Sequence, residues 1–154
     1  MTAAAARGST PREHVAAAVS RHGAATVVAT CVVMLRGDEV DDELVVALVG
    51  RGHALWFLEG GAAYWGRVWG ARGLLYVFDD TATAALIEAA TDPSWRVREM
   101  VAKVVAKRRL GDAAGAVAAL QGDSVPRVRT AAGRALARLA PDDRAPSSRG
   151  AARS

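Results

Sequence analysis

A seven-residue segment occurs twice in this chain, 31 residues apart, and this repetition constrains the fold more than any other feature. Residues 92–98 have the sequence DPSWRVR, and residues 123–129 have the sequence DSVPRVR. Each predicted long helix is followed by a short one, 62–78 by 82–90 and 93–109 by 113–120. A period of about 30 residues that is built from helix pairs is typical of an α-solenoid, in which each pair packs on its neighbours.

The helix after the first copy is amphipathic, and the residues at both of its ends favour helix boundaries there. Asp92 is a suitable N-cap, Pro93 suits the first helical position, and Gly111 favours an end to the helix. The apolar residues recur at helical spacing and form one stripe, which in an amphipathic helix faces the core. We expect this stripe and its equivalents in the second copy to be buried, namely Val97, Val101, Val104, Val128, Ala132 and Leu136.

The rest of the chain predicts helices and no sheet, because no segment sustains apolar–polar alternation bounded by hairpin turns. The predicted helices lie near 11–22, 24–36, 41–50, 53–60, 62–78, 82–91, 93–109, 112–121 and 126–140. We predict an all-α protein, a right-handed α-solenoid formed by one domain at 11–140, with disordered ends at 1–10 and 141–154. Within this domain we expect a divergent helical part and three repeats, at 11–61, 62–91, 92–122 and 123–140.

These motifs resemble HEAT repeats, most closely the short HEAT-like repeats of phycobilisome lyases. The shared features are the D-x-x-x-R-V-R signature, the A-x-x-V/A-L spacing after it, and a short second helix that ends in Asp. The signature residues are Asp92, Val97, Arg98, Asp123, Val128 and Arg129. Residues 64–76, YWGRVWGARGLLY, resemble a segment of small actinobacterial HEAT-repeat proteins of unassigned function. The resemblance implies that the arginine after the signature valine bridges toward the capping aspartate, as a ladder along the stack.

A weaker copy of the repeat lies upstream. At an offset of 29 residues, Arg67 aligns with Arg96, and Trp69 occupies the position of the signature arginine. Ala63 then stands where the signature has aspartate. On this alignment we expect Trp69 to flank the core instead of filling it.

Charge and composition exclude several classes of protein. The net charge is −5 over residues 41–92 and +7 over residues 93–140. The one cysteine, Cys31, excludes an intrachain disulfide framework. The longest run without a charge or a helix breaker, residues 24–35, is too short to span a bilayer, and residues 1–12 lack the pattern of a secretory signal. We therefore expect a cytoplasmic protein without a membrane partner.

The sequence contains few candidates for catalytic or metal-binding residues. Its three histidines, His14, His22 and His53, are not spaced as metal ligands, and no phosphate-binding glycine motif occurs. Cys31 lies in the apolar segment ATVVATCVVML, where we expect a buried thiol with no base beside it. We predict no enzymatic activity, no catalytic residue, no cofactor and no metal.

Two groups of side chains are candidates for binding a partner. Basic residues recur along the outer side of the two long helices, and we expect them on one face: Arg96, Lys103, Lys107, Arg127, Arg134 and Arg138. Trp65 and Trp69 belong to a concentration of aromatic residues between 56 and 95, which serves either as a binding patch or as filling between residues 11–60 and the repeats.

Three functions remain open on this basis. The first is a scaffold for protein–protein interaction, with a partner that the sequence does not name. The second is binding of a nucleic-acid phosphate backbone through the basic C-terminal repeats. The third is an accessory enzyme of the lyase or glycosylase kind, which requires an acidic or thiol side chain in a cleft. The oligomeric state does not follow from the sequence.

Overall fold

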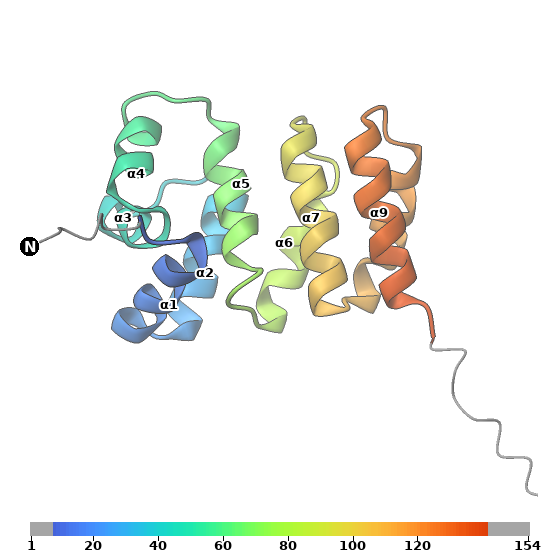
Figure 1. Cartoon of the computed structure of the whole chain (residues 1–154), viewed down its shortest axis with the longest axis horizontal. Coiled ribbons are helices and arrows are strands. Elements are labelled where there is room, and N and C mark those ends of the chain that lie inside the picture. The colour runs from blue at the N-terminus through green and yellow to red at the C-terminus, as the bar shows by residue number, and fades with distance from the viewer. Residues whose placement is uncertain (1–7, 142–154) are drawn as a thin grey trace, which may run out of the picture.

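The structure is a computed structural model that describes residues 8–141, and within this range it contains nine α-helices, three short 3₁₀ helices and no strand (Figure 1). The α-helices are α1 (Pro11–His22), α2 (Ala24–Leu35), α3 (Asp42–Val49), α4 (Arg51–Leu58), α5 (Tyr64–Gly73), α6 (Thr83–Ala89), α7 (Trp95–Arg108), α8 (Ala114–Ala119) and α9 (Pro126–Leu139). The 3₁₀ helices are η1 (Asp80–Ala82), η2 (Gly111–Ala113) and η3 (Leu120–Gly122). The expected all-α class is confirmed. The predictions for 1–7 and 142–154 lie outside the described residues.

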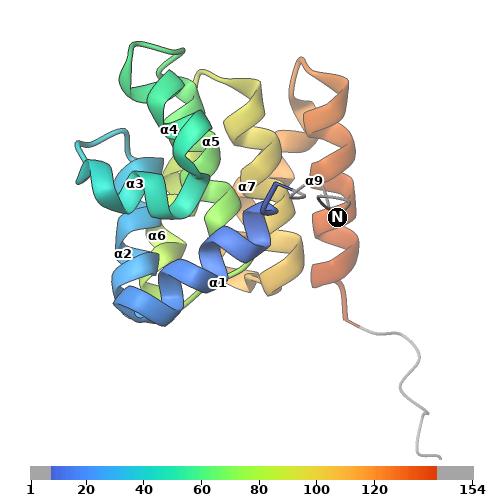
Figure 2. The same ribbon diagram turned by 60° about the vertical axis from the view of Figure 1, so that its left-hand side comes forward.

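The long helices α5, α7 and α9 stand side by side in one row, with α6 packed against α7 and α8 against α9 (Figure 1). This stack of helix pairs is the expected α-solenoid. The N-terminal helices cover the other side of α5, because α2 packs directly on α5, while α3 packs on α1 and α4 follows α3 (Figure 2). One continuous core runs from α1 to α9. Between residues 8 and 141, no helix is both long and apolar enough to cross a membrane.

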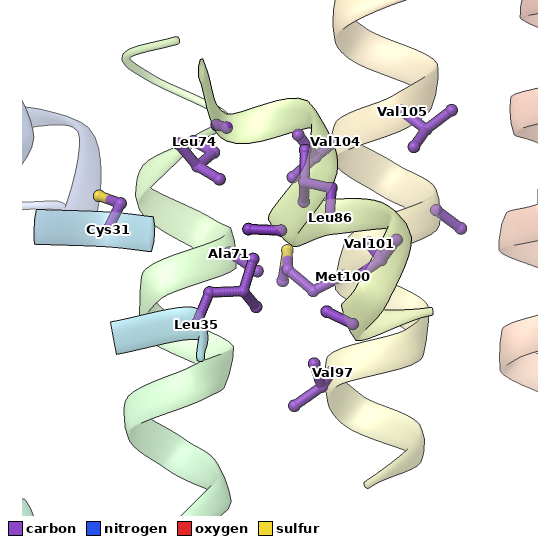
Figure 3. Close-up of a cluster of buried hydrophobic side chains, with 14 of the residues drawn as sticks. Cys31, Leu35, Ala71, Leu74, Leu86, Val97, Met100, Val101, Val104 and Val105 are labelled. Carbon is purple, nitrogen blue, oxygen red and sulfur yellow. The ribbon is translucent and has the colours of Figure 1, made fainter. Parts of the chain in front are cut away.

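The core contains the apolar stripe that the repeat predicts. Leu136 is partly buried against this core. The other five expected residues have no exposed surface, namely Val97, Val101, Val104, Val128 and Ala132. Figure 3 shows how Leu74 just after α5, Leu86 of α6 and Val104 of α7 point into the space between the three helices. Each helix pair therefore buries its apolar side against the next, which is what holds a solenoid together.

The ends of the helices differ from the prediction in several places. Helix α7 begins at Trp95, so Pro93 is not its first residue, and Asp92 instead accepts a hydrogen bond from the Ser94 N–H (2.8 Å) in the turn before the helix. At the other end Arg109 adopts a left-handed conformation (φ 52°), and the helix ends before Gly111 is reached. Thr10, placed in the N-terminal tail by the sequence, forms a capping box with Glu13 at the start of α1.

Helix α5 also ends earlier than predicted, at Gly73, and the two residues that follow it are held by a side chain of α7. The guanidinium group of Arg108 on α7 donates to the Leu74 carbonyl oxygen (3.1 Å) and to the Leu75 carbonyl oxygen (2.9 Å). Carbonyl groups at a helix end lack intrahelical partners, and a cation is favoured there. Arg108 thus ties the end of α5 to the end of α7.

Helices α2 and α5 cross at very short distance because two glycines of α5 have no side chain. A Cβ atom on Gly70 would lie 2.6 Å from both the Cys31 carbonyl oxygen and the Leu35 nitrogen of α2. A Cβ atom on Gly73 would lie 2.5 Å from the Cys31 sulfur. These contacts attach the divergent N-terminal helices to the first long helix of the row.

Candidate interaction surface

Two ion pairs join successive helix pairs and set their register. Arg98 Nε and Nη2 donate to the Asp123 carboxylate at 2.7 and 3.1 Å. Arg67 Nε and Nη2 donate to the Asp92 carboxylate at 2.7 and 3.2 Å, over the same separation of 25 residues. The ladder that the HEAT resemblance implies is therefore present, and it runs from each arginine to the aspartate of the next repeat.

This ladder corrects the alignment of the first repeat. Arg67 makes the contact that Arg98 makes one repeat later, so the offset between them is 31 residues and not 29. Arg67 is thus the signature arginine of the first repeat, and Trp69 does not occupy that position. The copy is harder to recognise because Gly66 stands in the position of Val97, and Gly61 in that of Asp92.

Each aspartate of the ladder also holds the turn before its own helix. Asp123 accepts a hydrogen bond from the Val125 N–H (2.9 Å), and Arg129 Nη1 donates to the Asp123 carbonyl oxygen (2.7 Å). The hydrogen bond from Arg98 holds the pKa of the Asp123 carboxyl below its usual value. The same hydrogen bond raises the pKa of Arg98. A charged, bidentate pair of this kind fixes the position of the long helices relative to one another.

The 31-residue register between α7 and α9 places four of the six predicted basic residues in two rows across these helices. Lys103 and Arg134 are equivalent positions, as are Lys107 and Arg138. These four side chains line a groove of about 600 Å³ between the two helices. We call it the α7–α9 groove; the rest of its lining is Ala106, Ala131 and Ala137. No acidic residue lines the groove.

The charges in the α7–α9 groove are only partly neutralised. Lys103 pairs with Glu99 (3.1 Å), which lies beside the groove on α7. Lys107, Arg134 and Arg138 are exposed, and they form no ion pair with any residue between 8 and 141. The Lys107 ammonium lies 5.3 Å from the Tyr76 ring centroid, so Arg134 and Arg138 are the two cations of the groove that contact neither a carboxylate nor an aromatic ring among the described residues.

The other two predicted basic residues lie apart from the α7–α9 groove. Arg96 is half-buried, with its guanidinium carbon 4.4 Å from the Trp95 ring centroid and 5.8 Å from that of Trp65. The guanidinium carbon of Arg127 also lies near the Trp95 ring, 5.4 Å from its centroid, and Arg127 pairs with Glu99 (3.2 Å). These two arginines are already occupied by aromatic rings and a carboxylate.

Trp65 and Trp69 are half-buried and pack mainly against other rings. Their ring centroids lie 6.2 Å apart, and Trp69 also contacts Phe57 (6.2 Å) and His53 (5.4 Å) of α4. These contacts attach α4 to α5, as aromatic edge contacts commonly do in a core. The structure thus places both tryptophans in the joint between the N-terminal helices and the repeats.

Sequence analysis missed a second surface, on α4. Leu55, Trp56 and Leu58 are 49%, 48% and 41% exposed. Beside them lies a cleft of about 500 Å³, here called the α4 cleft, bounded by the end of α2, the following loop, α3, α4 and the start of α5. A signal was present in the sequence, because residues 55–58 are four consecutive apolar residues, which one helix face cannot bury.

The described residues show no arrangement suited to metal or thiol chemistry. No group of three His, Cys, Asp or Glu side chains between 8 and 141 is placed to bind a metal ion. Cys31 lines a small cavity of about 60 Å³ but is itself inaccessible, and burial raises the pKa of its thiol to about 12. Because a nucleophilic cysteine requires a thiolate, this side chain is inert at neutral pH.

The stack of helix pairs and its Arg–Asp ladder agree with the comparison with known families. The family model described as HEAT repeats matches residues 53–137, which include α5 to α8 and most of α4 and α9. The chain belongs to the HEAT-repeat family. Comparison with curated proteins and with solved structures yields no match. HEAT repeats commonly serve as binding surfaces for other proteins, but a fold alone names no partner.

Proposed function

We propose that this HEAT-repeat protein is a non-enzymatic scaffold whose α7–α9 groove binds an acidic, amphipathic segment of a partner protein. The α7–α9 groove carries the proposal, because it combines positive charge along both walls with an apolar floor. Lys107 of α7 and Arg138 of α9 both line it, together with Ala106, Ala131 and Ala137. An amphipathic helix with acidic flanks matches this pattern in both charge and hydropathy.

The basic and alanine lining of the α7–α9 groove favours a protein over a nucleic acid as the partner. A phosphate backbone would gain from the cations but would leave the alanine floor without apolar contacts. Binding of unpaired bases relies on aromatic rings beside the cations, and no aromatic residue between 8 and 141 lines the α7–α9 groove. Binding to a phosphate backbone is therefore the alternative outcome of the test below. The third function, an accessory enzyme, loses its thiol because Cys31 is inaccessible and protonated. The acidic side chains that it also allows do line a cleft, the α4 cleft.

The test uses the full chain and fluorescence anisotropy with two labelled probes. One probe is a helix-forming peptide with glutamate on one face and leucine on the other, and the second is DNA, offered single-stranded and as a duplex. The peptide is expected to bind with an affinity that falls as salt rises from about 50 to 200 mM, because screening weakens exposed charge contacts. Tighter binding of either DNA, with no binding of the peptide, would overturn the proposal in favour of a nucleic-acid partner.

A charge reversal identifies the surface that binds. Lys107→Glu with Arg138→Glu changes one residue on each wall, and neither residue belongs to an ion pair among the described residues. Lys103 is left unchanged because it neutralises Glu99, which is buried. The matched control reverses Arg21 and Arg51, two exposed residues outside the groove.

We expect at least a tenfold loss of peptide affinity in the groove variant, since like charges across an interface are strongly unfavourable. The control should bind as the native chain does. Equal affinity of the two variants would show that the peptide binds elsewhere and would overturn the assignment of the α7–α9 groove.

A further inference from the structure

The α4 cleft is the second large concavity of the molecule, and its lining has the opposite charge to that of the α7–α9 groove. Its apolar wall includes Met34 of α2, Val45 of α3 and Phe57 of α4. A volume of about 500 Å³ lies within the usual range of ligand sites, about 300–1,000 Å³. It is large enough for one or two bulky side chains of a partner.

The rim of the α4 cleft is acidic and lacks a neutralising partner. Asp38, Glu39 and Asp42 line it and are exposed, and no residue between 8 and 141 pairs with their carboxylates or donates a hydrogen bond to them. The one cation in the lining, Arg67, is held by two hydrogen bonds to Asp92. The charge that an occupant meets in this cleft is therefore negative.

The α4 cleft exists because α4 departs from the repeat pattern. Gly66 occupies the position of the buried residues Val97 and Val128, and Phe57 of α4 packs where its side chain would be, 2.6 Å from a Cβ built on Gly66. Helix α4 is held to α5 at this point, while Leu58 both lines the cleft and is 41% exposed. Apolar surface thus continues from the cleft onto the outside of α4, where Leu55 and Trp56 are exposed.

We propose that the α4 cleft docks a basic, apolar peptide segment of a partner protein, independently of the α7–α9 groove. Charge complementarity argues for this occupant, because three unpaired carboxylates surround an apolar wall, and a lysine or arginine beside a bulky apolar residue satisfies both. A second copy of the chain fits less well. The cations that a second copy could offer are those of its α7–α9 groove, and the residues beside them are alanines. Alanine side chains are too small to fill the apolar part of the α4 cleft. The protein then carries two docking surfaces of opposite charge and joins two different partners.

The test titrates the full chain with three labelled probes of equal length, a leucine–lysine peptide, a leucine–glutamate peptide and a lysine–serine peptide. Binding is followed by anisotropy and by the methyl resonances of methionine. Met34 lines the α4 cleft, whereas Met100 of α7 lies in the core and serves as an internal reference. We expect the leucine–lysine peptide to bind and to shift the Met34 methyl signal while leaving the Met100 signal in place.

Neutralising the rim tests the assignment without disturbing the fold. Asp38→Asn with Glu39→Gln and Asp42→Asn retains side-chain size, and Asp41, the N-cap of α3, is left unchanged. The matched control neutralises three exposed acids that do not line the cleft and form no ion pair with a described residue, Glu59, Asp80 and Asp112. We expect at least a tenfold loss of leucine–lysine affinity in the rim variant and no change in the control.

Three results would overturn the proposal. They are equal binding of the leucine–glutamate or the lysine–serine peptide, equal loss in the rim and control variants, or an unshifted Met34 signal. Failure here is distinguishable from failure of the α7–α9 groove, because Lys107→Glu with Arg138→Glu should leave leucine–lysine binding intact.

Discussion

The guanidinium group of Arg98 holds the carboxylate of Asp123 through two hydrogen bonds, 2.7 and 3.1 Å long, that cross from one helix pair to the next. Only 15% of the Arg98 side chain and 7% of the Asp123 side chain are exposed. Arg67 and Asp92 repeat the contact one unit earlier. Both rows of the α7–α9 groove depend on this register, because a shift of one residue along α9 would move Arg134 and Arg138 away from Lys103 and Lys107.

Replacing Arg98 with alanine is expected to lower the free energy of unfolding by about 2–3 kcal/mol, because it leaves the shielded Asp123 carboxylate without its charged partner. Arg98→Lys keeps the charge but loses the bidentate geometry, so its free energy of unfolding should lie between those of the native chain and the alanine variant. The control is Glu88→Gln, which breaks the exposed pair with Arg36 and should cost less than about 1 kcal/mol. Urea unfolding followed by circular dichroism measures all three. If Arg98→Ala lowers the free energy of unfolding no more than Glu88→Gln does, the ladder has no structural role.

The ladder also predicts a dependence of stability on pH. The hydrogen bond from Arg98 lowers the pKa of Asp123 in the folded state, so that on acidification the unfolded chain takes up this proton first. The stabilisation is complete above the ordinary aspartate pKa, about 3.9, and is lost as pH falls through the lower folded value. Asp123→Asn should therefore lose less stability than the native chain between pH 7 and pH 3. Identical losses in urea unfolding at the two pH values would disprove this contribution.

The close crossing of α2 and α5 predicts opposite effects for two glycine-to-alanine changes. At Gly70 the new methyl group meets the backbone of α2 at 2.6 Å, and overpacking of this kind costs about 1–3 kcal/mol. At Gly133, in the interior of α9, nothing lies within 4 Å, so alanine should stabilise the helix by about 0.5–1 kcal/mol. Thermal unfolding of the two variants provides the measurement. A stabilised Gly70→Ala would mean that the helices do not approach so closely.

Cys31 is expected to resist thiol reagents in the folded protein. Its side chain has no exposed surface, and burial raises its pKa to about 12, so that the thiolate is scarce at neutral pH. Ellman's reagent should label it only as fast as the α2–α5 contact opens, and at once in concentrated urea. Labelling within minutes under native conditions would be evidence against a purely structural cysteine and would return the accessory-enzyme function to consideration.

The sequence alone determined the helices of this protein, the core of its C-terminal repeats and the separation of its charges. These properties are local, because helix spacing, caps and the apolar stripe of Val97, Val101 and Val104 are visible within one or two turns. The same periodicity placed Lys103, Lys107, Arg134 and Arg138 on one side of their helices, and the structure brings these four together. Whether they bind a partner remains a prediction.

The tertiary structure decided what depends on contacts between helices. It identified Arg67 as the first arginine of the ladder, since its partner Asp92 lies 25 residues away and no local pattern around Arg67 indicates the pair. It showed that aromatic rings already occupy Arg96 and that Trp65 and Trp69 join α4 to α5. It also produced the α4 cleft, because Gly66 leaves room for Phe57, and acidic residues of the α2–α3 loop line the same cleft as apolar residues of α2, α3 and α4. Such a site arises only when side chains distant in sequence share a limited volume, and single-helix periodicity carries no information about that volume.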